Sequence, residues 1–263
     1  MYKHVAILGV DGMGAFNGRT DTPNFDKLFA NGAVTYDALT ARPTISAECW
    51  GAMLLGIDAD VHKLTNSIVD KEPYPVDSVY PSVFRVVHEL YPDAKLAAFS
   101  NWSPINRGII EANLGVTTGT GNDQEVCDAA IAYLEENEPV LLFMQFDEVD
   151  GMGHKFGYGT PQHLAWITRT DDLIGQVVDK YAEKGYDDTL FIVSADHGGT
   201  PQRGHGGDTD AEKLIFIGVA GKTVQKGVIA GMQVKDIAAI AATALGAALP
   251  AAWSGRVPAE VSL

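Results

Sequence analysis

Short apolar runs alternate with longer amphipathic stretches along this chain. The apolar runs lie at 4–10, 34–39, 95–100, 140–146, 189–194 and 214–219, and they are typical of strands covered on both faces. Helical periodicity is present at 23–31, 47–55, 81–90, 123–137, 161–184 and 234–248. Because strands that alternate with helices build parallel sheets, the pattern predicts an α/β protein with a largely parallel central sheet and helices on both faces.

Residues that start or stop elements support these boundaries. Thr22-Pro23 is typical of a helix start, and Gly185 is typical of a helix end. The segment 102–122 is rich in glycine and proline, which predicts a long surface excursion. The chain shows no repeat, low-complexity segment or clear linker, so we expect residues 1–263 to form a single domain.

Composition and charge narrow the function classes. Hydrophobic residues make up 46% of the 263 residues and charged residues 20%, as in an ordinary soluble globular protein. The net charge of −15 argues against bulk nucleic acid as a partner, but it permits a small phosphorylated substrate where metal cations reverse the local field. Cys49 and Cys127 have neither metal-type spacing nor a disulfide pattern. No apolar run forms a signal segment or reaches membrane-spanning length, so we expect a cytoplasmic protein without a membrane partner.

Aspartate and histidine side chains follow three of the predicted strands. After the strands that end near residues 10, 146 and 194 come Asp11, Asp150, His154, Asp196, His197 and His205. Because the carboxyl ends of parallel strands meet at one edge of a sheet, we expect all six side chains to converge there. Three carboxylates and three imidazoles suit two divalent cations with three protein ligands each, which leaves open positions as in catalytic zinc sites. Two such cations would leave about one net positive charge, which favours an anionic phosphate.

Ser46 lies at or near the start of the predicted helix 47–55. Serine is a good N-cap, and this role alone accounts for its position. The same geometry also places a hydroxyl beside free backbone N–H groups and the positive end of the helix dipole, which together form an anion site. We interpret Trp50 and Cys49 as helix packing, and Trp102 as either a pocket wall or packing on the sheet.

These motifs, in their order along the chain, resemble the alkaline phosphatase superfamily and, within it, the type I phosphodiesterase/nucleotide pyrophosphatase branch. The resemblance rests on Val10-Asp11-Gly12, Pro43-Thr44-Ile45-Ser46, His62-Lys63-Leu64-Thr65-Asn66, Asp150-Gly151-Met152-Gly153-His154, Ser194-Ala195-Asp196-His197-Gly198 and Gly204-His205-Gly206. It implies an alkaline phosphatase-like fold. Because the chain is short for that family, it also implies that there is no large cap domain.

The resemblance further implies a role for each side chain. One metal takes Asp11, Asp196 and His197, and the other takes Asp150, His154 and His205. Ser46 is the nucleophile, at a position where the family usually carries threonine, and Asn66 contacts the substrate phosphate. The implied reaction is hydrolysis of phosphate esters, foremost phosphodiester or nucleotide pyrophosphate bonds, through a covalent phosphoseryl intermediate. Zinc is the implied metal, and manganese is also compatible with these ligands.

Departures from the family pattern leave the substrate open. Glu48 and Val149 stand where proline is common, and Lys63 stands where glycine is frequent. We expect the partner to be a small phosphorylated molecule, and nucleotides are among the candidates.

Two other functions compete with this interpretation. A phosphate-monoester hydrolase on the same site would need an extra cation, for which the candidates are Arg42, Lys63, Arg107 and Arg203. A non-catalytic metal-binding module is less favoured, because structural zinc sites prefer four protein ligands that include cysteine. A sulfatase is not favoured, because the residues after Ser46 lack the proline and arginine of sulfatase segments.

Overall fold

The computed structural model describes residues 1–261 and 263, and its centre is an eight-stranded mixed sheet. The strand order is β4-β3-β5-β1-β6-β7-β2-β8. The strands are β1 (His4–Val10), β2 (Ala33–Leu39), β3 (Lys95–Ser100), β4 (Thr117–Thr120), β5 (Pro139–Phe146), β6 (Thr189–Ala195), β7 (Leu214–Ala220) and β8 (Gly227–Val228). Within the described chain, the neighbouring strands are parallel except that β7 runs antiparallel to β6 and β2.

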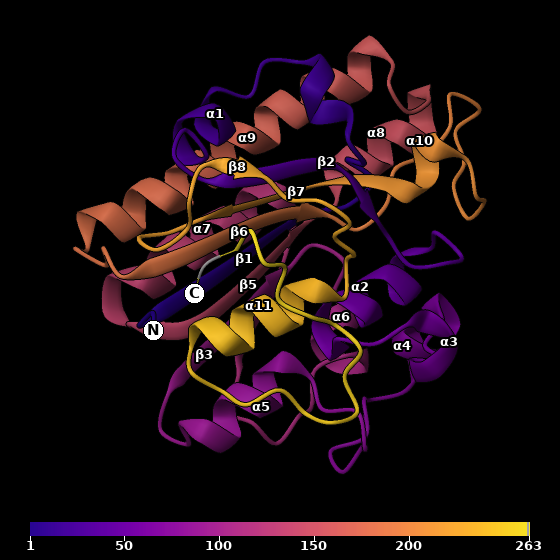
Figure 1. Cartoon of the computed structure of the whole chain (residues 1–263). Coiled ribbons are helices and arrows are strands. Elements are labelled where there is room, and N and C mark those ends of the chain that lie inside the picture. The colour runs from indigo at the N-terminus through magenta and orange to yellow at the C-terminus, as the bar shows by residue number, and fades with distance from the viewer. Residues whose placement is uncertain (262) are drawn as a thin grey trace.

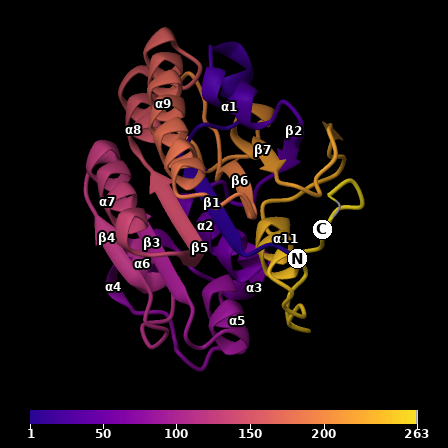
Figure 2. The same ribbon diagram turned by 90° about the vertical axis from the view of Figure 1, so that its left-hand side faces the viewer.

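Helices cover both faces of the sheet, as predicted (Figures 1 and 2). One layer contains α1 (Pro23–Leu28), α7 (Asp123–Glu136), α8 (Glu148–Phe156) and α9 (Pro161–Glu183), with the 3-10 helix η1 (Phe16–Arg19) against α9. The other side holds α2 (Ser46–Leu55), α3 (Ala59–His62), α4 (Asn66–Lys71), α5 (Val83–Leu90), α6 (Pro104–Gly108) and α11 (Asp236–Ala244). The short helix α10 (Asp210–Lys213) precedes β7. The observed fold therefore confirms the predicted α/β class.

The central strands bring the predicted site residues to one edge. All seven residues of β1 are buried, as expected for a strand between two parallel neighbours. Val10 pairs with Phe146 of β5 on one side and with Ala195 of β6 on the other. The residues that follow the three strands therefore leave the sheet side by side.

Two local predictions need correction. The excursion 102–122 contains the helix α6 and the edge strand β4, whose threonine-rich residues are mostly exposed and so form no apolar run. The last helix spans 236–244 rather than 234–248, because Gly246 turns into the left-handed region at φ 85°. The antiparallel direction of β7 agrees with a largely parallel sheet, and it arises because β7 returns directly from the edge at which β6 ends.

No helix in the described part of the chain has both the length and the apolar character that crossing a bilayer requires.

Candidate active site

Three of the predicted ligands form a buried group at the carboxyl ends of β1 and β6. We call Asp11, Asp196 and His197 the first triad; their ligand atoms lie within 4.8 Å of one another. The Nε2 of His197 is 3.4 Å from Asp11 Oδ1 and 3.4 Å from Asp196 Oδ2. All three residues are at most 1% exposed. The structure thus brings together a set of residues that the sequence separates by 186 positions.

The fold uses one oxygen of each first-triad carboxylate and leaves the other unpaired. Asp11 Oδ2 accepts hydrogen bonds from Trp50 Nε1 at 3.0 Å and Gln145 Nε2 at 3.1 Å. Asp196 Oδ1 accepts from the backbone N–H groups of Gly12 at 3.1 Å and His197 at 2.7 Å. Asp11 Oδ1 and Asp196 Oδ2 are buried and have no hydrogen-bond partner among the described residues. Unpaired buried acceptors of this kind are costly, and they point to a cation.

His197 directs its Nε2 toward the two unpaired carboxylate oxygens. Its Nδ1 donates to the carbonyl oxygen of Gly198 at 2.9 Å, so Nε2 is left with a lone pair. Burial lowers the pKa of His197, which keeps the imidazole neutral. A neutral imidazole whose other N–H is held by a carbonyl is the usual form of a metal-ligating histidine.

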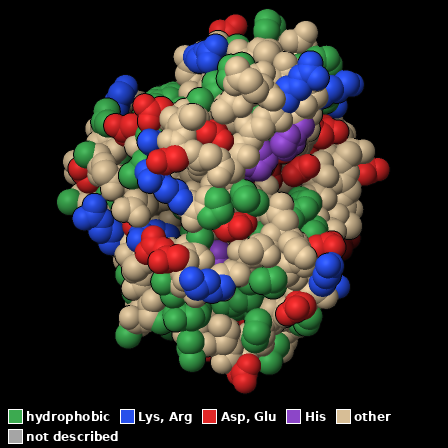
Figure 3. All heavy atoms as spheres, turned by 90° about the vertical axis from the view of Figure 1, so that its right-hand side faces the viewer, with side chains coloured by type: hydrophobic (Ala, Val, Ile, Leu, Met, Phe, Trp, Pro, Cys, Tyr) green, Lys and Arg blue, Asp and Glu red, His purple; other side chains and the backbone are tan. Residues whose placement is uncertain are grey.

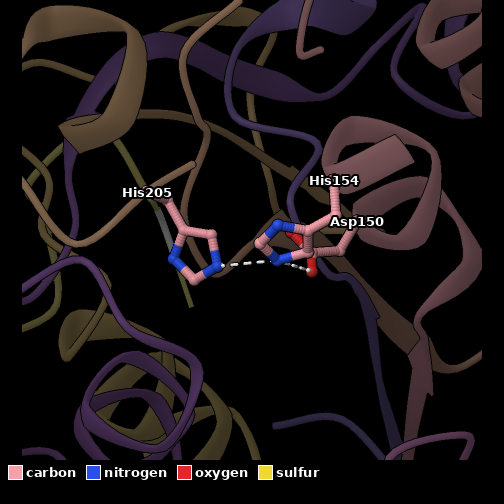
Figure 4. A group of neighbouring side chains, drawn as sticks. All are labelled: Asp150, His154 and His205. Atoms are coloured by element: carbon pink, nitrogen blue, oxygen red, sulfur yellow. Dashed lines mark hydrogen bonds and ion pairs between the residues drawn. The ribbon is translucent and has the colours of Figure 1, made fainter. Parts of the chain in front are cut away.

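The second triad consists of Asp150, His154 and His205, whose ligand atoms also lie within 4.8 Å of one another. Asp150 and His154 come from successive turns of α8, and His205 comes from the loop after β6 (Figure 4). His154 Nε2 is 3.1 Å from Asp150 Oδ2 and 3.2 Å from His205 Nε2. The three side chains therefore point at a common centre.

Each residue of the second triad also makes a hydrogen bond through the side-chain atom that points away from the centre of the triad. The Nδ1 of His154 bonds to the carbonyl oxygen of Arg203 at 3.0 Å, and that of His205 bonds to the carbonyl oxygen of Thr44 at 2.7 Å. The Tyr158 hydroxyl donates to Asp150 Oδ1, which leaves Oδ2 for the centre of the triad. These contacts fix both imidazoles with Nε2 inward.

The two triads are neighbours. The His197 and His205 rings stack with centroids 3.9 Å apart and planes inclined by 18°. Figure 3 shows the side of the molecule that lies on the right in Figure 1. On this face, histidine side chains form a patch between acidic side chains. Two cations bound to the triads would therefore lie side by side, one in the buried first triad and the other beside the exposed His154 of the second.

The electrostatics of the two triads differ. Burial, and then repulsion by Asp196, Asp150 and Asp147, raises the pKa of Asp11 well above its usual range. Burial acts to raise the pKa of Asp150 as well, but hydrogen bonds from His154 and Tyr158 lower it to about 2. The hydrogen bond to Asp150 raises the pKa of His154 to about 9. In the metal-free protein a proton on His154 therefore sits between the three ligand atoms that a cation would join.

The residues present fit a pair of divalent cations. The first triad offers two carboxylates and one imidazole, and the second offers one carboxylate and two imidazoles. Such oxygen and nitrogen ligands suit Zn²⁺ or Mn²⁺. The unpaired buried oxygens of the first triad are the observation that supports this fit.

Ser46 lies beside the first triad. It is the first residue of α2, and Ile45 holds the N-cap position in extended backbone. The Oγ of Ser46 is 3.3 Å from His197 Nε2. The carbonyl oxygen of the Asn66 side chain accepts a hydrogen bond from the backbone N–H of Ala47 at 2.9 Å, so Asn66 is fixed at the start of α2. The structure therefore brings the predicted nucleophile and the predicted phosphate contact to one helix end.

Sequence reasoning missed four residues of this site. Trp50 is buried packing, as interpreted, but its indole also holds Asp11. Tyr158 holds Asp150, and Gln145 bridges Asp11 and Asp147 with one amide nitrogen, at 3.1 and 2.9 Å. Asp147 is a fourth carboxylate at this edge; burial and then repulsion by Asp150 raise its pKa.

For Trp50 and Tyr158, glycines in the sequence indicate that a large side chain packs closely against a neighbouring element. A Cβ on Gly9 would lie 2.4 Å from Trp50 Cη2, and one on Gly153 would lie 2.3 Å from a ring carbon of Tyr158. A glycine inside a strand or helix often marks such a close approach.

A mixed α/β sheet with two ligand triads and a hydroxyl at one edge defines the class of alkaline phosphatase-like proteins. The chain belongs to the type I phosphodiesterase/nucleotide pyrophosphatase family, whose profile matches residues 72–245. This match confirms the predicted family. Asp11, Ser46 and Asn66 lie before the matched residues, and the roles of all the candidate site residues stay predictions.

Solved structures share the fold across almost the whole chain. Murine ectonucleotide pyrophosphatase/phosphodiesterase 5 superposes with a TM-score of 0.75 at 12% identity, covering 97% of each chain. A 2-O GAG sulfatase superposes with a TM-score of 0.75 at 14% identity, covering 100% of this chain and 76% of that one. At these identities the likeness is one of fold.

Curated relatives match over shorter segments. The catalytic subunit of human GPI ethanolamine phosphate transferase 3 is 31% identical over 90 residues, which are 34% of this chain and 8% of that protein. Human ectonucleotide pyrophosphatase/phosphodiesterase family member 7 is 28% identical over 82 residues, or 31% of this chain and 18% of that protein. The matched segments thus span less than a fifth of these relatives' lengths.

Proposed function

We propose that this protein is a metal-dependent hydrolase that cleaves phosphodiester or nucleotide pyrophosphate bonds. One observation carries the proposal: the Ser46 hydroxyl lies 3.3 Å from His197 Nε2, which belongs to a triad whose two carboxylates each keep a buried oxygen without a hydrogen-bond partner among the described residues. The family membership supports hydrolysis of phosphate esters.

The triads would hold the two cations. Asp11, Asp196 and His197 would bind one, and Asp150, His154 and His205 would bind the other. When bound, such ions neutralise phosphate charge and lower the pKa of a coordinated hydroxyl or water. The remaining work falls to the chain's own groups.

Ser46 is the nucleophile in this proposal. Its Oγ forms a bond to phosphorus as the bond to the leaving oxygen breaks, and the hydroxyl proton leaves with the released group. The product is a phosphoseryl ester that keeps the second ester group of the substrate. Water then cleaves the bond between Ser46 and phosphorus, which releases the phosphate monoester and returns a proton to Ser46. The start of α2 supports the phosphate, because first-turn N–H groups and the helix dipole attract anions. Asn66 uses its carbonyl oxygen on Ala47, so its NH₂ group is left to donate to a phosphoryl oxygen.

Diesters are favoured over monoesters because two candidate cations are engaged elsewhere. Arg42 Nε pairs with Asp208 Oδ1 at 3.1 Å, and the Arg107 guanidinium donates to the carbonyl oxygen of Asp70. A dianionic monoester would lack their charge. A nucleotide substrate is supported by the fold shared with murine ectonucleotide pyrophosphatase/phosphodiesterase 5, which has been solved as an inactive variant with AMP (TM-score 0.74, 12% identity).

The test uses the protein loaded with Mn²⁺ or Zn²⁺. We expect hydrolysis of bis(p-nitrophenyl) phosphate to exceed that of p-nitrophenyl phosphate, and a chelator to abolish both. Ser46→Ala should remove turnover and leave ion content unchanged, and acid quenching of the wild type with this diester should trap a p-nitrophenylphosphoryl group on Ser46. Turnover that persists in Ser46→Ala would show that water attacks phosphorus directly. Activity that is insensitive to chelation would contradict a role for the cations.

A further inference from the structure

Thr44 contacts the loop that carries His205 and lies two residues before Ser46. The Thr44 residue is fully buried. Its backbone oxygen accepts from His205 Nδ1 at 2.7 Å. Its Oγ1 accepts from the Gly206 N–H at 2.9 Å and donates to the Gly207 carbonyl oxygen at 3.1 Å. One residue therefore holds three consecutive residues of the loop.

The His205 loop depends on these contacts for its position. His205 stands between Gly204 and Gly206, which have no side chains to pack, and Gly206 adopts a φ of 106°. On the far side of the loop, Glu212 Oε1 accepts from the Gly207 N–H at 2.7 Å. Thr44 is the anchor on the side of the nucleophile.

Only a hydroxyl can satisfy both the Gly206 N–H and the Gly207 carbonyl oxygen at this point. The same Oγ1 must accept from an N–H and donate to a carbonyl oxygen, which a serine or threonine can do. Valine has the shape of threonine but leaves these two backbone groups without their partner at the buried Thr44 position.

We propose that Thr44 is a positioning residue that fixes the second triad relative to Ser46. This inference rests on the proposed function only where it concerns catalysis; the effect on cation binding stands apart from it. Through Thr44 the ligand His205 and the segment that leads to Ser46 form one unit, so binding of a cation at the second triad also orders the nucleophile. Among the described residues, no hydrogen bond joins Thr44 to the first triad, and the link between them is the stacking of His205 on His197. We therefore expect the hydroxyl to affect the second triad much more than the first.

The experiment compares Thr44→Val with Thr44→Ser, and uses Thr118→Val on the exposed strand β4 as the matched remote control. Mn²⁺ binding is measured by calorimetry and by ion content. We expect Thr44→Val to weaken one of two binding steps by roughly 10- to 100-fold, as loss of a ligand's support does, and to leave the other step within about threefold. Thr44→Ser should recover most of the lost affinity. Thr118→Val should bind like the wild type.

Several results would overturn the assignment. These are wild-type binding by Thr44→Val, equal weakening of both steps, or a loss in Thr44→Ser as large as in Thr44→Val. A wild type that binds no Mn²⁺ also overturns it. If Thr44→Val does not fold, as judged by circular dichroism, Thr44→Ala carries the same expectation.

Turnover separates this inference from the proposed function. At saturating Mn²⁺ we expect Thr44→Val to lower kcat for bis(p-nitrophenyl) phosphate, because Ser46 is less well placed. If the wild type cleaves no phosphate ester while Thr44→Val still weakens a single binding step, the proposed function fails and the positioning role stands. If the wild type is active and both binding steps are unchanged in Thr44→Val, the positioning role fails alone.

Discussion

Each ligand carboxylate gives one oxygen to a donor of the fold and keeps the other for the triads. The donors to Asp11 and Asp150 are side chains, namely the Trp50 indole with the Gln145 amide and the Tyr158 hydroxyl. The donors to Asp196 are backbone N–H groups. Such supporting contacts set ligand orientation, so their loss weakens metal binding without removing a ligand.

The substitution Tyr158→Phe tests whether such a supporting contact affects cation binding, because it removes a single oxygen atom. The change removes the hydroxyl from Asp150 Oδ1, and we expect cation affinity at the second triad to fall roughly 10-fold. Tyr74→Phe is the control, because it removes a hydroxyl that donates to the Tyr80 carbonyl oxygen at 2.6 Å, away from the triads. Both variants should lose about 1 kcal/mol of stability. Calorimetric Mn²⁺ titration decides: equal affinities in the two variants would contradict the role of Tyr158.

At the scale of elements, Gly9 lets α2 pack on β1. A methyl group at Gly9 would lie 2.4 Å from Trp50, which is fully buried and donates to Asp11. We expect Gly9→Ala to lower the free energy of unfolding by about 1–3 kcal/mol through overpacking, and to lower turnover by moving the indole. Gly227→Ala, where a Cβ meets nothing within 4 Å, should stay within about 0.5 kcal/mol of the wild type. Urea unfolding measures both, and a Gly9→Ala protein as stable and active as the wild type would refute the packing argument.

His163 joins α9 to the loop after β1. Its Nε2 donates to the Gly12 carbonyl oxygen at 3.1 Å, and its Nδ1 accepts from the Gly159 N–H at 3.3 Å. Burial lowers the pKa of His163 to about 4. Between about pH 6.5 and 4 the unfolded chain binds this proton and the folded chain does not, so stability present above pH 6.5 is lost as the pH falls.

The corresponding measurement is a urea titration at several pH values for wild type and His163→Gln. The glutamine amide can still donate to Gly12 but does not titrate. We expect the wild type to lose up to about 3 kcal/mol more than the variant between pH 6.5 and 4, since one pKa unit corresponds to about 1.4 kcal/mol. Parallel curves for the two proteins would show that His163 is charged or exposed in the folded state.

The sequence predicted which aspartate side chains come together because they follow the ends of apolar strands. Asp11, Asp150 and Asp196 follow apolar runs, and a buried aspartate is costly unless its carboxylate has a hydrogen-bond donor or a cation as a partner. Trp50, Gln145 and Tyr158 were not predicted as site residues, because a donor among apolar neighbours has the same pattern as packing. The strands β4 and β8 were also missed: β4 is mostly exposed, and β8 has only two residues.

At the scale of the whole molecule, the edge of the sheet that carries both triads concentrates negative charge in a chain whose net charge is already −15. Burial, and then repulsion by neighbouring carboxylates, raises the pKa values of Asp11, Asp147 and Asp196. Cations should relieve this repulsion. An ion at 100 times its Kd adds about 2.7 kcal/mol per site, or roughly 5–10 °C in Tm for one site in a chain of this size. Thermal unfolding with a chelator and with added Mn²⁺ measures the shift, and an unchanged Tm would exclude both sites.

The second triad should bind its cation with release of a proton. Because the pKa of His154 is raised to about 9 in the metal-free protein, a cation must displace that proton. We expect affinity at this triad to rise by up to about tenfold per pH unit between pH 7 and 9. Calorimetry in two buffers of different ionisation enthalpy counts the protons, and binding without proton release would show that His154 is not a ligand.

The antiparallel direction of β7 affects how well the chain can tolerate insertions and deletions. The end of β6 and the start of β7 lie at the same edge of the sheet, so residues 196–213 need not cross over the sheet. This one connection supplies side chains to both triads. Its length is not tied to any helix that spans the sheet. The exposed residues Pro201 and Gln202 are therefore a natural place for insertions that reshape the entrance to the site, while every strand keeps its neighbours and the Arg203 carbonyl oxygen keeps its contact with His154.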